Sequence, residues 1–126
     1  MRYALQGLVA ASLLAIVSPT MATGRCVLPV ADGGDTEPSP ASVVGRIVSV
    51  DARQMRVVVS KSKSSQVLLA PDTELFTVYG GGVEVSELRP GQHALVWFKG
   101  CAAPKRGAPV AAVVQICSVS PEPCPS

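Results

Sequence analysis

The most reactive side chains of this chain belong to four cysteines, Cys26, Cys101, Cys117 and Cys124. No two of them are separated by the short intervals that zinc knuckles and Cys-x-x-Cys redox motifs use. An even number of cysteines in a small exported domain is typical of a disulfide framework, and four cysteines allow three pairings. The sequence therefore predicts two structural disulfides and leaves their pairing open.

The first 22 residues have the features of a cleaved export signal, which bears directly on the state of the cysteines. Arg2 supplies a positive charge, residues 8–17 form an apolar run, and Thr20-Met21-Ala22 offers small residues for a signal peptidase. The run is shorter than the about 20 apolar residues that span a bilayer. We therefore expect cleavage after about Ala22, a mature chain without a transmembrane anchor, and a periplasmic or secreted location.

His93 is the only histidine of the chain, and Met55 is the only methionine beyond the leader. A Ser-His-Asp triad would need His93, but no Gly-x-Ser-x-Gly elbow frames a nucleophile. Paired carboxylates for glycoside hydrolysis would need an apolar pocket to raise one pKa, and the acidic residues lie in turn or edge contexts without one. The acidic residues in question are Asp72, Glu74, Glu84 and Glu87. We predict that the protein is not an enzyme and uses no cofactor.

The net charge of +2 at pH 7 is too small to indicate a nucleic-acid or membrane partner. The basic residues are nevertheless concentrated in one stretch of the chain, and a second basic loop covers residues 99–106. An exposed tryptophan beside such a stretch would be a strong contact residue in an interface, although the near-continuous apolar run at residues 92–99 favours a strand covered on both faces. The predicted binding surface consists of Arg46, Arg53, Arg56, Lys61, Lys63 and Trp97.

Glycine and proline divide the mature chain into three parts. Residues 23–40 are rich in Gly, Pro and acidic residues, which predicts a flexible arm that Cys26 attaches to the body. Residues 41–119 carry short apolar and β-branched runs between turn signals, and residues 120–126 form a proline-rich tail. We expect one folded domain, at 41–119.

Short β-strands dominate the pattern of the domain, and helical periodicity never exceeds one turn. Pro71 is expected to end the third strand, Ser86 to cap a single helical turn, and Leu88 to point inward. These features predict an all-β fold, a small five- to six-stranded OB-like barrel with one short helical turn. The expected strands cover residues 42–50, 55–60, 66–70, 73–79, 92–99 and 110–119.

The order of three motifs resembles that of small periplasmic OB-like barrels of bacteria. The motifs are Gly45-x-Ile47-x-x-Val50-Asp51, then Asp72-Thr73, then Ser86-x-Leu88-x-Pro90-Gly91-Gln92. Such barrels include copper and silver chaperones as well as secreted barrels without an assigned function, so the resemblance implies a fold more than an activity. The chaperones bind Cu(I) through one His and two Met under a Trp, after the second strand. Here residues 61–66 contain no His, Met or Trp, so the resemblance carries over no metal ligand.

Together these observations predict an exported, non-catalytic binding module of the bacterial cell envelope that recognises a protein or another envelope component. One alternative is a periplasmic copper-type chaperone with a non-standard site built from Met55, His93 and Trp97. A second alternative is the binding of an oligosaccharide or single-stranded nucleic acid on the barrel face, where Trp97 would stack on the ligand.

Overall fold

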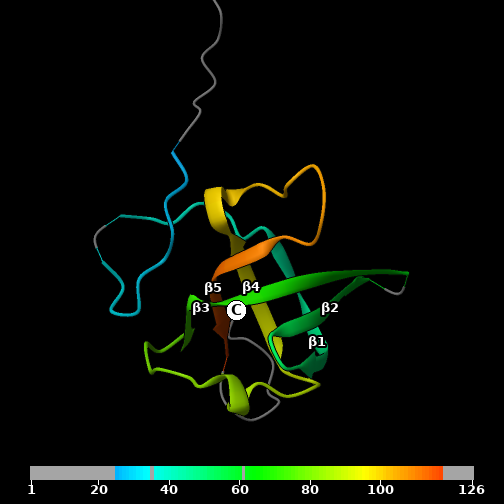
Figure 1. Ribbon diagram of the computed structural model, residues 1–126. Coiled ribbons are helices and arrows are strands. Elements are labelled where there is room, and N and C mark those ends of the chain that lie inside the picture. The colour runs from blue at the N-terminus through cyan, green and yellow to red at the C-terminus, as the bar shows by residue number, and fades with distance from the viewer. Residues whose placement is uncertain (1–24, 35, 61, 118–126) are drawn as a thin grey trace, which may run out of the picture.

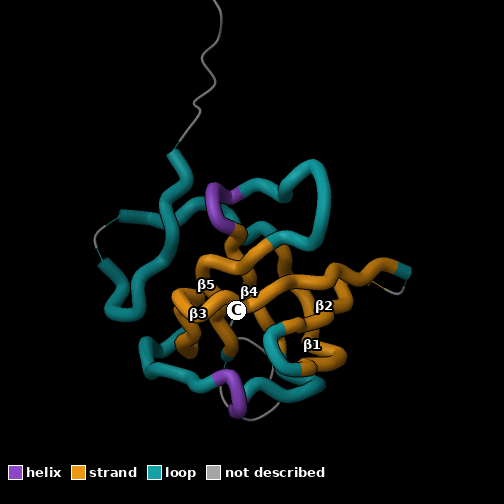
Figure 2. Tube along the Cα trace, viewed as in Figure 1, coloured by secondary structure: helices purple, strands orange, loops and turns teal. Residues whose placement is uncertain are grey.

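A computed structural model describes residues 25–34, 36–60 and 62–117 of the chain. The expected export signal, the proline-rich tail, Lys61 and Cys124 lie outside the described residues. Five strands form a closed barrel in the order β1-β2-β3-β5-β4 (Figures 1 and 2), which confirms the all-β fold. The strands are β1 (Val43–Asp51), β2 (Gln54–Ser60), β3 (Lys63–Thr77), β4 (His93–Phe98) and β5 (Val110–Ile116).

The barrel closes through one parallel contact, between β3 and β5, while all other neighbouring strands are antiparallel. Alternate residues of each strand face its interior, as the period of two in the sequence requires. Ile47, Met55 and Val57 are buried there with the alternating residues of β4 and β5. Only two short 3₁₀ turns interrupt the described part of the chain, η1 (Val85–Glu87) and η2 (Lys99–Cys101).

The third strand differs from the expectation, because β3 continues through Pro71 instead of ending there. The register with β5 shifts between Leu69 and Glu74, so Pro71 lies in an irregular stretch of β3 where its missing N–H is tolerated. The Thr73 hydroxyl replaces part of the ladder, since it accepts from the Ala70 N–H at 2.8 Å and donates to the Ala111 carbonyl at 2.7 Å. Two expected strands are therefore one element.

The helical turn after β3 also forms differently from the sequence prediction. Its N-cap residue is Glu84, whose N–H donates to the Glu87 carboxylate at 2.9 Å, so the assignment of Ser86 as the cap was wrong. Leu88 is buried beneath the turn, as expected. The Gln92 side chain is 1% exposed and joins the turn to the barrel, because it accepts from the Arg89 N–H and donates to the Glu87 carbonyl.

Candidate functional site

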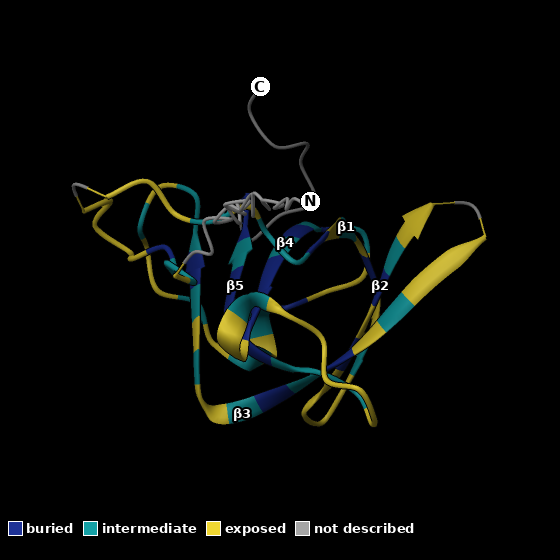
Figure 3. Ribbon diagram, turned by 90° about the horizontal axis from the view of Figure 1, so that it is seen from above, coloured by how far each residue is buried: buried dark blue, intermediate teal, exposed yellow. Residues whose placement is uncertain are grey.

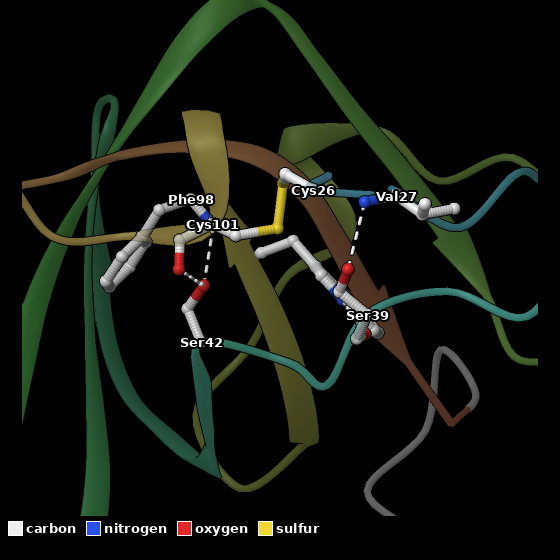
Figure 4. Close-up of a disulfide and its surroundings, with 7 residues drawn as sticks. Cys26, Val27, Ser39, Ser42, Phe98 and Cys101 are labelled. Carbon is white, nitrogen blue, oxygen red and sulfur yellow. Dashed lines mark hydrogen bonds between the residues drawn. A yellow bond between two sulfur atoms is a disulfide. The ribbon is translucent and has the colours of Figure 1, made fainter. Parts of the chain in front are cut away.

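The chain's N-terminal arm is joined to the barrel by a disulfide between Cys26 and Cys101, whose Cα atoms are 5.5 Å apart (Figure 4). Cys117 is also disulfide-bonded, and the described residues contain no free cysteine. The prediction that the cysteines are oxidised therefore holds for all three described ones. Cys26 attaches the arm as expected, at η2, directly after β4.

Hydrogen bonds fix the arm at points other than the disulfide. Val27 and Ser39 bond to each other twice, with the Val27 N–H donating to the Ser39 hydroxyl at 2.9 Å and the Ser39 N–H donating to the Val27 carbonyl. The arm also approaches the loop after β3, because a Cβ on Gly80 would stand 2.5 Å from the Ala31 carbonyl oxygen. Gly80 has a φ of 93°, which is a second reason for glycine at this position.

Trp97 lies beneath the arm, on the outer side of β4. It is 4% exposed, and its indole N–H donates to the Ser39 carbonyl at 2.8 Å. Phe76 and Val113 pack with Trp97 in a second apolar cluster, which Leu28 of the arm covers. The arm thus explains why β4 is apolar on both faces. The inclusion of Trp97 in an exposed binding surface was wrong, because the tryptophan has no free face for stacking on a ligand.

The predicted basic residues are distributed along β2 and its neighbours. Arg46 and Arg56 lie on the outer side of the sheet, since β1 pairs Arg46 with Val58 and pairs Ser49 with Arg56. Lys63 pairs with Ser60 near the tip of the β2–β3 hairpin, which is largely exposed (Figure 3). Lys61 lies outside the described residues. Arg46, Arg56 and Lys63, hereafter the outer basic surface, are all exposed.

Arg53 is exposed in the β1–β2 turn, at the far end of β2 from Lys63. It lines a cavity of about 440 Å³ together with residues that include Leu68, Leu69 and Val110. An apolar hollow beside a guanidinium group suits an apolar side chain of a partner flanked by a carboxylate. No local sequence pattern predicts this cavity, because it forms where β3 meets β5.

The residues of the alternative metal site are not brought together. Met55 is 0% exposed in the barrel interior, whereas His93 and Trp97 belong to the outward-facing side of β4. The His93 Nε2 atom is 3.1 Å from a guanidinium nitrogen of Arg46. Among the described residues, no group of three or more His, Cys, Asp or Glu side chains is arranged to hold a metal ion.

Lys99 and Asp72 form an ion pair at the edge of the arm, with both carboxylate oxygens 3.2 Å from the ammonium nitrogen. The hydrogen bond from Lys99 is the main reason why the pKa of Asp72 lies below its ordinary value, and the positive charge of Lys99 adds to the effect. This is the one ion pair among the described residues. Lys99 belongs to the second predicted basic loop, and the ion pair with Asp72 already compensates its charge.

Comparison with protein families, with curated proteins and with solved structures found no match to the chain. The described residues contain no helix that is long and apolar enough to cross a membrane. The surfaces and cavities of the barrel are therefore the features that can indicate a function.

Proposed function

We propose that this protein is an exported, non-catalytic binding module of the bacterial cell envelope, which recognises an acidic partner protein through the outer basic surface and the adjacent turn at Arg53. The observation that carries the proposal is the uncompensated charge of this surface. Its three side chains, those of Arg46, Arg56 and Lys63, are exposed, and none of them forms an ion pair with another described residue.

The neighbouring side chains support the same conclusion. Strand β2 has no acidic residue, and neither does the part of β3 that pairs with it. Next to Arg56 across the sheet are Ser49 and Gln66, which are polar and uncharged. Asp51 lines the same hollow as Arg56 but forms no ion pair with it, so the surface keeps a net positive charge. Uncharged hydrogen-bonding groups around arginine are common at protein interfaces, and a net positive surface favours an acidic partner. The cavity beside Arg53 would add an apolar anchor point.

The experiment is a capture in the native cell envelope with matched variants. The full chain, tagged at its C-terminus, is crosslinked in the producing cells, and co-purified proteins are identified by mass spectrometry. The test variant carries Arg53→Glu, Arg56→Glu and Lys63→Glu. The control carries Arg25→Glu, Arg89→Glu and Lys105→Glu, which change the net charge equally at exposed residues elsewhere.

We expect one stoichiometric acidic partner that both wild type and control retain and that the test variant loses. A partner that all three proteins retain would place the interface elsewhere and contradict the proposal. Capture of nothing above background by the wild type would also contradict it, and would favour a small ligand over a protein.

A further inference from the structure

A cavity of about 510 Å³ lies between the arm and the barrel, and the outer basic surface contributes no residue to it. One wall is the arm, at Leu28, Pro29 and Val30, and the opposite wall includes Ala112 and Val113 of β5. The walls are therefore largely aliphatic. Its volume falls within the range of small-molecule sites, about 300–1,000 Å³.

The walls are held in place without a ligand. The Cys26–Cys101 disulfide connects them directly, because Cys26 precedes the arm wall and Cys101 follows the lining residue Gly100. The bonds between Val27 and Ser39 fix the other side of the arm's loop, and Ser39 in turn accepts the indole N–H of Trp97. A site with fixed walls loses little conformational entropy on binding, which favours a specific ligand.

Three charged side chains line the cavity: Asp72, Glu74 and Lys99. Lys99 is bound to both carboxylate oxygens of Asp72, so these two charges compensate each other. The Glu74 carboxylate, for which the structure records no ion pair, leaves the lining with one net negative charge. A cationic group is therefore favoured in this cavity and an anionic group is disfavoured.

We propose that this cavity is a binding site for a small organic cation with an apolar chain, an alkylammonium ion, whose chain lies against Leu28, Val30 and Ala112 and whose ammonium group pairs with Glu74. The site needs the disulfide, since the arm supplies one of its walls, three of the nine lining residues. The proposal extends beyond the recognition of an acidic partner: its ligand has the opposite charge and its residues are different. Either proposal can fail while the other stands.

The test is a titration of the oxidised mature chain, methyl-labelled for NMR, with octylammonium chloride. Sodium octanoate is the matched probe, because it has a chain of similar length and the opposite charge. Octylammonium is expected to shift the methyl signals of Leu28, Val30 and Ala112 saturably and to bind at least about threefold more tightly than octanoate. Equal binding of the two probes, or shifts confined to other methyl groups, would overturn the proposal.

Two variants locate the site. Glu74→Gln is expected to weaken octylammonium binding about two- to fivefold, the range for a solvent-exposed ion pair. The control Asp51→Asn removes a carboxylate at the end of β1, outside the cavity lining, and should leave the affinity unchanged. The double variant Cys26→Ser, Cys101→Ser is expected to lose the saturable shifts because the arm wall is released. If Glu74→Gln binds octylammonium as tightly as the wild type, the pairing of the ammonium group with Glu74 is refuted, even if the cysteine variant fails to fold. If the cysteine variant folds and binds octylammonium as tightly as the wild type, the ligand does not bind in the cavity beneath the arm.

Discussion

Strands β1 and β2 approach each other closely at Gly45, and replacing this glycine with alanine tests the barrel packing directly. A Cβ built on Gly45 would overlap the carbonyl oxygen of Val58 and would stand 2.8 Å from Cγ1 of Val57. The first obstacle is backbone, so it cannot rotate away as the end of a flexible side chain would. Because Gly45 also pairs with Ala94 of β4, displacing β1 would disturb the ladders on both of its sides.

Overpacking of a closed core costs about 1–3 kcal/mol, and a backbone obstacle places Gly45→Ala in the upper half of that range. For a domain of this size, each kcal/mol lowers Tm by about 4–8 °C, so we expect a decrease of roughly 10–20 °C. The assay is urea unfolding of the oxidised protein, followed by circular dichroism, with thermal melting as a second measurement.

The matched control is Gly82→Ala, because nothing lies within 4 Å of the Cβ that this change would add. Its free energy of unfolding should stay within about 0.5 kcal/mol of the wild type. If Gly45→Ala is also that close to the wild type, β1 and β2 do not approach each other as described, and the argument for glycine at this position is refuted.

Three further predictions concern groups outside that contact. Gln92→Ala should lower the free energy of unfolding, measured by urea titration, by about 2–4 kcal/mol, because it leaves a cavity and removes the hydrogen bonds to the Arg89 N–H and the Glu87 carbonyl. A loss under about 1 kcal/mol would show that Gln92 does not join the turn to the barrel. Asp72 has a pKa below its ordinary 3.8, so its contribution exists above the unfolded pKa and disappears as pH falls through the folded pKa. Asp72→Asn should thus be slightly less stable than wild type at pH 6 and equally stable at pH 2, and a difference independent of pH would exclude the ion pair as its cause. Cys26→Ser with Cys101→Ser opens a link between residues 75 apart, for which loop entropy predicts a loss of about 4 kcal/mol; unchanged denaturant midpoints would show that the arm is not cross-linked.

The periodicity of the sequence predicted the barrel strands well because most of them alternate between the interior and solvent. Met55 and Val57 alternate with Arg56 and Val58 in β2, and the structure buries the first pair and turns the second outward. Such alternation depends only on neighbouring residues and a strand's two faces. The long strand β3 was missed because Pro71 normally ends a strand, whereas here the register shift near it makes the missing N–H harmless.

The candidate surfaces were less predictable, since they depend on contacts between distant segments. Trp97 was a candidate contact residue, although the apolar run of its strand favoured burial on both faces. The structure buries it in an apolar cluster that the arm covers, at Ser39 and Leu28. The two cavities likewise form where segments distant in sequence meet, such as Leu28 with Val113 and Arg53 with Val110. By contrast, the exposure of Arg56 and Lys63 followed from their positions on a strand and at a hairpin tip.

The measurement that tests the proposed function most directly is the salt dependence of binding. Purified wild type and the Arg53→Glu, Arg56→Glu, Lys63→Glu variant are immobilised in the oxidised state, and retention of solubilised envelope proteins is measured from 50 to 500 mM NaCl. If the outer basic surface and Arg53 form the interface, the wild type retains an acidic protein at low salt and releases it as screening increases, while the variant retains none. Retention that is equal in both proteins, or independent of salt, would contradict the account.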